Sequence, residues 1–356
     1  MVQEFSGRLI AWQRQYGRHG LPWQQTRDPY RVWLSEIMLQ QTQVATVLAY
    51  YPRFLAAFPS VQQLAAASQE EVMALWSGLG YYSRARNLHR CAQAICSAWG
   101  GEFPATAEAL QTLPGIGPST AAAIVAFCFA ERISIFDANV QRVMARVFAY
   151  DKDLSRTPHQ RELLHRAQQL LPSPEPEKDF AQRMVAYTQG LMDLGATVCT
   201  PRKPDCLNCP VAVLCQAQQL GKAEAYPVKL FRLRRTSENW WLLILLRQQP
   251  DGKTAVWLQQ RPSSGIWGGL HCPLVFKSEA ELVAALAGLP NAEKAQWHAS
   301  IKHALTHKDL NLHLVSVLWQ SADAPLTGIG LGQWYADWQN TGLPAPVRKW
   351  FQTAIA

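Results

Sequence analysis

Apolar side chains recur at helical spacing through the first part of the chain, behind signals typical of helix starts. Asp28 directly before Pro29, and Ser68 three residues before Glu71, are residues that commonly open a helix. The stretch 30–54, YRVWLSEIMLQQTQVATVLAYYPRF, is predicted to be one helix with apolar residues on more than one face. A further amphipathic helix is predicted over 180–199. This part of the chain is therefore predicted to be mainly α-helical.

The pattern changes after residue 220. The stretch 221–235, GKAEAYPVKLFRLRR, contains a proline and a group of cations, which is typical of a linker. Beyond it, 239–248, 254–262 and 312–318 are rich in β-favouring residues and lack a helical period, whereas 280–289 is helix-like. We therefore predict a helical domain over 1–220, a basic linker over 221–235 and a smaller α/β domain over 236–356.

Composition narrows the class of protein. The 356 residues suffice for two or three domains, and a net charge of +8 favours a polyanionic partner without distinguishing DNA, RNA and acidic lipid. No apolar run reaches the length of a membrane span, and the N-terminus lacks the pattern of a secretion signal. We expect a soluble monomer of the cytoplasm with no membrane partner, and the lack of a long targeting extension favours a bacterial cell.

The stretch 113–137, LPGIGPSTAAAIVAFCFAERISIFD, contains the first candidate site. Gly115 and Gly117 permit a tight turn, and Pro118 suits the first turn of a helix. Such a helix start points backbone N–H groups at an anion such as a phosphate. By itself, such a turn more often marks an ordinary helix start. Asp137, twenty residues past Gly117, places a carboxylate in an apolar neighbourhood.

A second carboxylate, Glu36, lies among Trp33, Ile37 and Met38 on the predicted helix. One interpretation is a surface glutamate on an amphipathic helix. The other is a partly desolvated carboxyl group whose pKa is raised, which suits a general acid.

Aromatic and basic residues alternate in the stretch that follows Gly80. Tyr81 and Tyr82 precede Arg84, Arg86 and Arg90. Tyrosine rings can stack on or wedge between bases, and arginines can hold phosphates. A buried tyrosine pair beside a solvated basic face fits the same pattern.

Four of the eight cysteines lie within seventeen residues, separated by six, two and five residues: Cys199, Cys206, Cys209 and Cys215. In a reducing compartment, such a group is more typical of a metal site than of disulfides. Four thiolates at this spacing can close on one tetrahedral centre. Only one pair is close in sequence, whereas zinc ribbons have two close pairs, so the spacing disfavours zinc.

Taken together, the Gly/Pro turn with its aspartate, the stretch LSEIMLQQTQV and the cysteine spacing resemble the helix-hairpin-helix, endonuclease III-like DNA glycosylases. Within that superfamily, the chain resembles the MutY-type adenine DNA glycosylases over nearly its full length. The second domain resembles their Nudix-like domain and lacks the glutamate cluster of the Nudix hydrolases after Gly269. The resemblance implies a 4Fe–4S cluster on the four cysteines and, as substrate, double-stranded DNA with adenine opposite 8-oxoguanine or guanine.

The resemblance also implies roles for individual residues. The catalytic residues would be Glu36 as general acid, Asp137 as the carboxylate that stabilises the sugar cation, and Asn139 as an orienting residue. The adenine pocket would be lined by Trp23, Gln189 and Asp193. The DNA contacts would be made by Gly115, Gly117, Ser119, Gln41, Tyr81, Arg84 and Arg86. The recognition of 8-oxoguanine would be made by Thr306 and His307. At the last site Leu305 replaces an aromatic residue of the family, which places stacking on the lesion in doubt.

Ser119 indicates the type of reaction. Bifunctional members of the superfamily carry a lysine at this position, and without an amine no Schiff base forms with the sugar. We therefore expect a monofunctional glycosylase that leaves an abasic site for a downstream endonuclease.

Three other functions fit parts of the sequence. They are a pyrimidine-directed glycosylase of the same superfamily, a DNA-binding iron–sulfur protein without catalysis, and a nucleotide hydrolase acting through the second domain. The Nudix-like domain argues against the pyrimidine-directed glycosylase. The presence of both Glu36 and Asp137 argues against a protein without catalysis, and the missing glutamate cluster argues against the nucleotide hydrolase.

Overall fold

The computed structural model describes residues 2–175, 177–230, 235–319 and 331–355. The chain divides into two compact units. Unit 1 comprises residues 1–66 and 90–232, and unit 2 comprises 67–89 and 233–356. The predicted limits, which assign 67–89 to the first domain, stay predictions.

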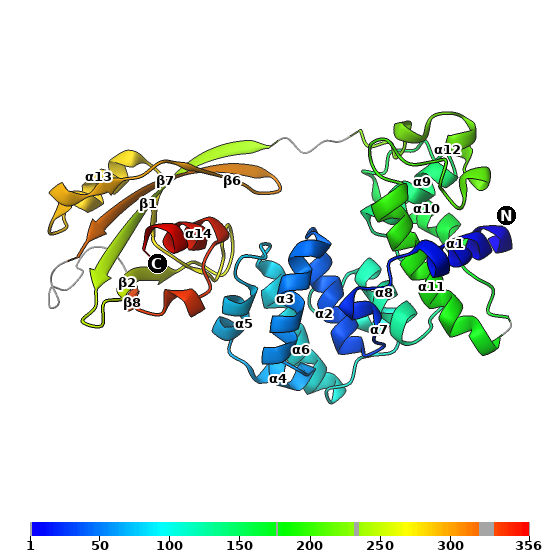
Figure 1. Cartoon of the computed structure of the whole chain (residues 1–356), viewed down its shortest axis with the longest axis horizontal. Helices are drawn as coiled ribbons and strands as arrows, with labels where there is room; N and C mark the ends of the chain where they lie inside the picture. Colours follow the sequence, from blue (N-terminus) through cyan, green and yellow to red (C-terminus); the bar gives the residue numbers. More distant parts are fainter. Residues whose placement is uncertain (1, 176, 231–234, 320–330, 356) are drawn as a thin grey trace. The chain divides into compact units, whose positions relative to one another are not determined.

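Unit 1 is helical, and its helices are shown in Figure 1. The helix α6 (Ser83–Trp99) is divided between the two units, and its part from residue 90 onward belongs to unit 1. The other elements of unit 1 are α1 (Val2–Tyr16), η1 (Pro22–Gln24), α2 (Pro29–Leu39), α3 (Val44–Ala57), α4 (Val61–Ala66), α7 (Ala107–Leu110), α8 (Pro118–Cys128), α9 (Ala138–Val147), α10 (Thr157–Gln169), η2 (Glu177–Asp179), α11 (Phe180–Asp193), η3 (Leu194–Val198), η4 (Ala212–Leu214), α12 (Gln216–Gln219) and η5 (Ala223–Ala225).

The centre of unit 1 is α8, which packs against α2, α7 and α11. Every residue from Thr120 to Phe127 is buried, so this helix is apolar on all sides as a core helix must be. It begins as the sequence predicts, with Gly117 as the N-cap residue and Pro118 in the first turn. Gly115 in the preceding turn has a φ of +79°, which glycine adopts without strain.

The prediction of one helix over 30–54 is wrong. The helix α2 ends at Leu39 and α3 begins at Val44. Between them the Thr42 N–H donates to the Leu39 carbonyl, and Gln41 has a φ of +54°. A left-handed residue cannot continue a right-handed helix, so the chain turns here. Apolar periodicity continues across the turn, which explains why the sequence pattern did not reveal it.

Unit 2 consists of the segment 67–89 and of a part beyond residue 232 that contains a mixed β-sheet. Its elements, with the first turns of α6, are α5 (Gln69–Trp76), β1 (Thr236–Gln248), β2 (Thr254–Gln260), β3 (His271–Cys272), β4 (Leu274–Phe276), α13 (Glu279–Ala287), η6 (Ala292–Lys294), β5 (Gln296–Trp297), β6 (Ile301–Ala304), β7 (Lys308–Leu318), β8 (Gln333–Tyr335), η7 (Trp338–Asn340) and α14 (Ala345–Ala354).

The long strands β1 and β7 form the middle of this sheet. They run parallel, from the pair Thr236–Lys308 to the pair Leu246–Leu318. The described strands follow the order β3-β2-β1-β7-β5, with β4 on β1, β6 on β7 and β8 on β2. Leu243, Val315 and neighbouring side chains form a core with Leu282 and Leu286 of α13. The antiparallel pair β6–β7 is a hairpin whose tip is 305–307.

None of the helices in the described ranges is long and apolar enough to cross a membrane.

Candidate active site

A cavity of about 1040 Å³ lies in unit 1. It is lined from the end of α2, the 40–43 turn, the beginnings of α8 and α9, and one side of α11. The structure brings seven of the predicted site residues to its wall: Trp23, Glu36, Gln41, Ser119, Asp137, Asn139 and Gln189. Residues up to 166 positions apart in the sequence (23 to 189) therefore face one space.

Glu36 reaches the cavity from the apolar helix α2. The Asp28 carboxylate caps that helix by accepting a hydrogen bond from the Tyr30 N–H at 2.9 Å. Trp33, Leu34 and Met38 are buried around it. Burial, with a smaller contribution from the nearby Asp137 charge, raises the pKa of Glu36 to about 8. Glu36 is therefore protonated at neutral pH and can donate a proton.

Asp137 is the N-cap residue of α9, and its carboxyl group has surroundings that differ from those of Glu36. Its Oδ1 accepts the Val140 N–H at 2.8 Å. Solvent reaches the carboxyl group from the cavity, yet desolvation on its protein side raises the pKa. The N–H groups of Val140 and Asn139 and the cation of Arg142 act in the other direction and favour the ionised form. Two neighbouring carboxyl groups thus have different surroundings, which is the pattern that separates an acid from a carboxylate.

Asn139 is held by Arg142, one turn further along α9. The Arg142 Nη2 donates to the Asn139 Oδ1 at 2.9 Å and to the Gly195 carbonyl at 2.7 Å. Its Nε donates to the Cys199 carbonyl at 2.8 Å. A Cβ atom on Gly195 would lie only 2.9 Å from the Asn139 Cβ, so the chain approaches α9 closely where α11 passes into the π-helical turn η3. The Asn139 amide is therefore fixed in orientation.

Gln189 is fixed in a similar way from behind the cavity wall. Its Nε2 donates to the Asp193 Oδ1 at 2.8 Å. Asp193 is 1% exposed, and its carboxylate also accepts the backbone N–H and the Nε of Arg18 at 2.9 and 2.8 Å. Because the Gln189 nitrogen is engaged by Asp193, its oxygen is the group left to accept a hydrogen bond in the cavity. Asp193 orients Gln189 and is itself outside the cavity lining.

Ser119 lies at the start of α8, where the resemblance places a lysine in bifunctional enzymes. Its Oγ accepts the Phe136 N–H at 3.3 Å, one residue before Asp137. Among the described residues that line the cavity, none is a lysine. The nearby Gly117 is exposed at the helix start, together with Gly115.

The four clustered cysteines lie in the loop after η3 and are half-buried. Burial raises the pKa of Cys209 to about 12, and the charges of Cys199, Cys215 and Cys206 add to the rise, as expected of thiols that lie near one another. Within the described ranges, no three Cys, His, Asp or Glu side chains are arranged to hold a metal ion.

A buried arginine adjoins this loop. Arg146 is 1% exposed, and its Nη1 lies 3.2 Å from the Cys199 Sγ. In the described part of the chain, no carboxylate lies within ion-pair distance of it. A buried cation is stable only beside compensating negative charge. Four neighbouring thiols beside such a cation are a donor set that fits a thiolate-bound iron–sulfur cluster.

The other predicted contact residues belong to unit 2. Thr306 and His307 are exposed at the tip of the β6–β7 hairpin, and the Thr306 Oγ1 donates to the Tyr81 Oη at 3.1 Å. Tyr81 is 42% exposed with a φ of +47°. Thr306, one of the two predicted lesion-recognition residues, therefore lies beside Tyr81.

The two predicted phosphate-binding arginines have partners within unit 2. The guanidinium group of Arg84 is buried and donates to the carbonyls of Leu79 and Gly80 at 3.4 and 3.2 Å. Arg86 donates to the Gly268 carbonyl. Both side chains support the unit internally, and their contact with DNA stays a prediction.

Sequence reasoning missed two arginines of unit 1 that hold site residues in place. Arg18 lies 175 positions from Asp193, and no local signal links the two. Arg142 could have been noticed, because it lies three residues after Asn139 on the same helical face.

Comparisons with known proteins define the class. Residues 34–172 match the profile of the HhH-GPD superfamily base excision DNA repair proteins, and 243–353 match that of the NUDIX domain. The chain is similar to a solved thermostable thymine-DNA glycosylase, with a TM-score of 0.54 and 27% identity over 61% of this chain and 95% of that one. A trapped endonuclease III–DNA intermediate, at 20% identity and a TM-score of 0.50, shares the fold. The fold and the matching profiles are those of a helix-hairpin-helix base-excision repair enzyme.

Two relatives of known name define the family more narrowly, and the first of them matches over nearly the full length. The adenine DNA glycosylase of Buchnera aphidicola (subspecies Acyrthosiphon pisum) is 32% identical over 97% of this chain and 96% of its own. The human adenine DNA glycosylase is 45% identical over 63% of this chain and 41% of its own. The chain belongs to the adenine DNA glycosylase family.

Proposed function

We propose that this enzyme hydrolyses the N-glycosidic bond of adenine paired with 8-oxoguanine or guanine in duplex DNA and leaves an abasic site. The observation that carries the proposal is the pair Glu36 and Asp137 at one cavity: burial raises the pKa of Glu36 to about 8, whereas backbone N–H groups and Arg142 favour the ionised form of Asp137 against desolvation. The family membership supplies adenine as the base.

The two carboxyl groups divide the chemistry. Adenine must first leave the base stack to reach the cavity. Glu36 donates its proton to a ring nitrogen of adenine, which makes the base a neutral leaving group as the bond from C1′ to nitrogen breaks. The Asp137 carboxylate stabilises the positive charge that develops on the sugar. Water then adds to C1′ and releases a proton, while Asn139 orients the sugar or the Asp137 carboxylate.

The base and the opposite strand would contact different residues. Trp23 and Gln189, with Asp193 behind, would line the adenine pocket. Gly115, Gly117 and Ser119 would present backbone and hydroxyl donors to the DNA backbone, and Gln41 and Tyr81 would enter the duplex. Thr306 and His307 would recognise 8-oxoguanine through their polar atoms. The net charge of +8 suits a DNA partner.

We further propose that the product is an intact strand with an abasic site. No lysine lies on the cavity wall as described, and Ser119 engages a backbone amide, so no amine is available for a Schiff base. A separate abasic-site endonuclease would then act next. The setting we propose is the bacterial nucleoid, with the enzyme working as a monomer.

We also propose a 4Fe–4S cluster on Cys199, Cys206, Cys209 and Cys215. Arg146 beside Cys199 supports this, because a buried cation suits a thiolate site. When bound, the cluster would supply a rigid centre for a loop that carries Arg202 and Lys203, two cations able to face a phosphate backbone. Anaerobically purified protein should contain about four irons and four acid-labile sulfides per chain. Protein that binds DNA and excises adenine without iron would contradict this role.

The test of the activity is a single-turnover assay on a labelled duplex with adenine opposite 8-oxoguanine. We expect strand cleavage at the adenine only after hot alkali. Cleavage without alkali would show a lyase step and contradict a monofunctional reaction. Product only from duplexes with oxidised pyrimidines would contradict adenine as the substrate.

A further inference from the structure

One buried side chain joins two separate segments of unit 1. The Arg146 Nη1 donates to the Cys199 Sγ at 3.2 Å and to the Thr200 carbonyl at 2.7 Å, and its Nη2 donates to the Pro201 carbonyl at 3.2 Å. Its Nε donates to the Tyr226 carbonyl at 3.1 Å. The guanidinium group is a rigid planar fork. The positions of 199–201 and of Tyr226 are therefore set together.

Tyr226 begins the exit segment, 226–230, the last described stretch of unit 1 before residue 231. Two contacts attach this segment to the loop 150–156. The Leu154 N–H donates to the Val228 carbonyl at 2.9 Å, and the Leu230 N–H donates to the Asp153 Oδ1 at 3.1 Å. The exit segment is thus attached to the protein on two sides.

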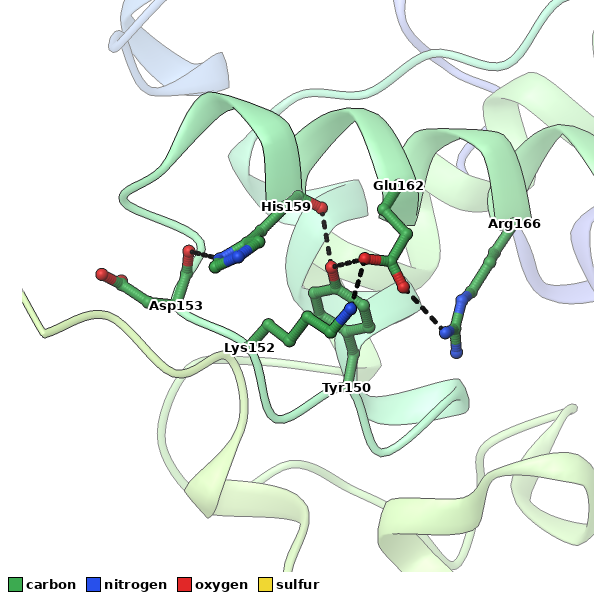
Figure 2. Close-up of polar contacts among 6 residues, drawn as sticks. All are labelled: Tyr150, Lys152, Asp153, His159, Glu162 and Arg166. Atoms are coloured by element: carbon green, nitrogen blue, oxygen red, sulfur yellow. Dashed lines mark hydrogen bonds and ion pairs between the residues drawn. The ribbon is translucent and has the colours of Figure 1, made fainter.

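The loop 150–156 is fixed without any help from the cysteines (Figure 2). The Tyr150 hydroxyl donates to the Glu162 carboxylate at 3.0 Å, and Lys152 and Arg166 donate to the same carboxylate at 2.7 and 2.9 Å. The His159 Nδ1 lies 2.9 Å from the Asp153 carbonyl. This network ties the loop to α10, so the position of the loop itself does not depend on the state of the cysteine loop, and any change at its contacts with the exit segment comes from the exit segment.

The contact at Tyr226 differs in this respect. Three of the four acceptors of Arg146 belong to the cysteine loop, and the Cys215 Sγ lies 3.3 Å from the Arg146 carbonyl oxygen. If 199–201 move, the buried guanidinium group should follow them, because three of its four contacts are with these residues and one is with the Tyr226 carbonyl. The contact with the Tyr226 carbonyl would then be lost.

We propose that Arg146 is a positioning residue that couples occupancy of the cysteine loop to the attachment of the exit segment. This inference rests on the proposed iron–sulfur cluster. With the cluster bound, 199–201 are fixed and the exit segment is held on both sides. Without it, only the contacts at 153–154 remain, and the chain leaves unit 1 less firmly held.

The experiment is amide hydrogen exchange on the full chain, with iron bound and after removal by a chelator under anaerobic conditions. The amide of Leu154 reports attachment directly, because its acceptor is the Val228 carbonyl. We expect its exchange to accelerate at least about tenfold when iron is removed. The Tyr150 N–H, bonded to the Ala145 carbonyl at 2.8 Å, is an internal control and should not change.

Three variants separate coupling from a general structural role. Arg146→Lys keeps the charge and loses the fork, so the Leu154 amide should exchange fast with and without iron. Asp153→Ala should accelerate exchange of the Leu230 amide in both states, while the response of Leu154 to iron remains. Arg161→Lys, at an exposed position on α10, should behave as the unchanged protein. If Arg146 had a purely structural role, the Leu154 amide would respond to iron in the same way in Arg146→Lys and in Asp153→Ala.

The outcomes distinguish the two proposals. If the protein without substitutions contains no iron after anaerobic purification, both the proposed cluster and the proposed coupling are overturned. Iron present, with equal Leu154 exchange in the loaded and stripped states, would overturn the coupling alone. If Arg146→Lys does not fold, this comparison on the unchanged protein decides the question.

Discussion

The cavity of unit 1 and the hairpin tip of unit 2 hold their polar groups in different ways. Around the cavity, Asp137 is engaged by a helix N-terminus, Asn139 by Arg142 and Gln189 by a buried carboxylate. At the tip, Thr306 and His307 are exposed, and the side-chain contact of Thr306 is with the exposed Tyr81. Groups that stabilise a developing charge must be aligned before the reaction. Groups that recognise a partner can instead be ordered by hydrogen bonds with that partner when it binds.

If alignment at the cavity matters most, the largest effect should come from Glu36→Gln. The amide keeps the size of the side chain and lacks an acidic proton, so we expect single-turnover excision to fall about 10³-fold. The excision rate of the unchanged enzyme should fall as pH rises through about 8, because Glu36 then loses its proton. The variant should lose that dependence. A variant rate that still falls above pH 8 would assign the titration to another group.

The same substitution should change stability in a pH-dependent way. The pKa of Glu36 rises from 4.5 to about 8 on folding, so the folded protein holds a proton that the unfolded chain releases between these values. This carboxyl group therefore lowers the free energy of unfolding progressively as pH rises from about 4.5 to 8. Relative to the unsubstituted protein, Glu36→Gln should gain about 4 kcal/mol at pH 8 over its difference at pH 4.5, measured by urea denaturation. An equal difference at both pH values would contradict the raised pKa.

The second largest effect should come from Gly195→Ala, which disturbs the cavity without removing a functional group. The added Cβ would lie 2.9 Å from the Asn139 Cβ and 3.4 Å from its backbone carbon. A displacement of this size in a positioning residue can lower a rate about 100-fold, and we expect single-turnover excision to fall by that order.

Gly190→Ala is the matched control, one turn earlier on the same helical segment. Its Cβ would meet the Leu9 Cγ at 3.0 Å and the Gln13 Cβ at 3.2 Å, both on α1, and Asn139 is not among its nearest neighbours. We expect lower thermal stability with the excision rate nearly unchanged. Equal losses of rate in both variants would show that helix packing, and not the position of Asn139, is the sensitive quantity.

A smaller effect is expected from Asp193→Asn. The amide can still accept from Arg18, but its own N–H₂ group competes with that of Gln189 for acceptors, so Gln189 is no longer oriented. We expect about tenfold slower excision of adenine, with a lower melting temperature because the buried contact with Arg18 loses its charge. Gln189→Ala serves as the reference. If Asp193→Asn slows excision in the Gln189→Ala background as much as alone, Asp193 does not act through Gln189.

The difference between the two regions also explains what the sequence could predict. Helix starts at Asp28 and Pro118 depend on neighbours in the chain, and the structure confirms both. Burial raises the pKa of Glu36, and the apolar residues on its own helix turn indicated that burial in advance. The contact between Arg18 and Asp193 spans 175 positions and depends on how α1 packs on α11, which no local pattern records. The break at Gln41 was missed because apolar periodicity continues across it.

The smallest effect should come from the exposed tip. Thr306→Val removes the hydroxyl that donates to Tyr81 and keeps the shape of the side chain. Since one hydrogen bond to an exposed group has a modest net value, we expect the preference for 8-oxoguanine over guanine opposite adenine to fall about fivefold. The excision rate on saturated 8-oxoguanine duplex should stay near that of the unchanged enzyme, because the cavity is untouched.

Tyr81→Phe tests whether the pair acts as a unit. It removes the acceptor of the Thr306 hydroxyl and leaves the ring available for stacking. If the contact between the two hydroxyls positions Thr306, the double variant should lose no more discrimination than Thr306→Val alone. Additive losses would mean that each hydroxyl contacts the DNA separately. If either tip variant lowers the excision rate on saturating 8-oxoguanine duplex as much as Gly195→Ala does, the two regions do not differ in the way proposed. The tip would then need to be aligned before the reaction, as the cavity is.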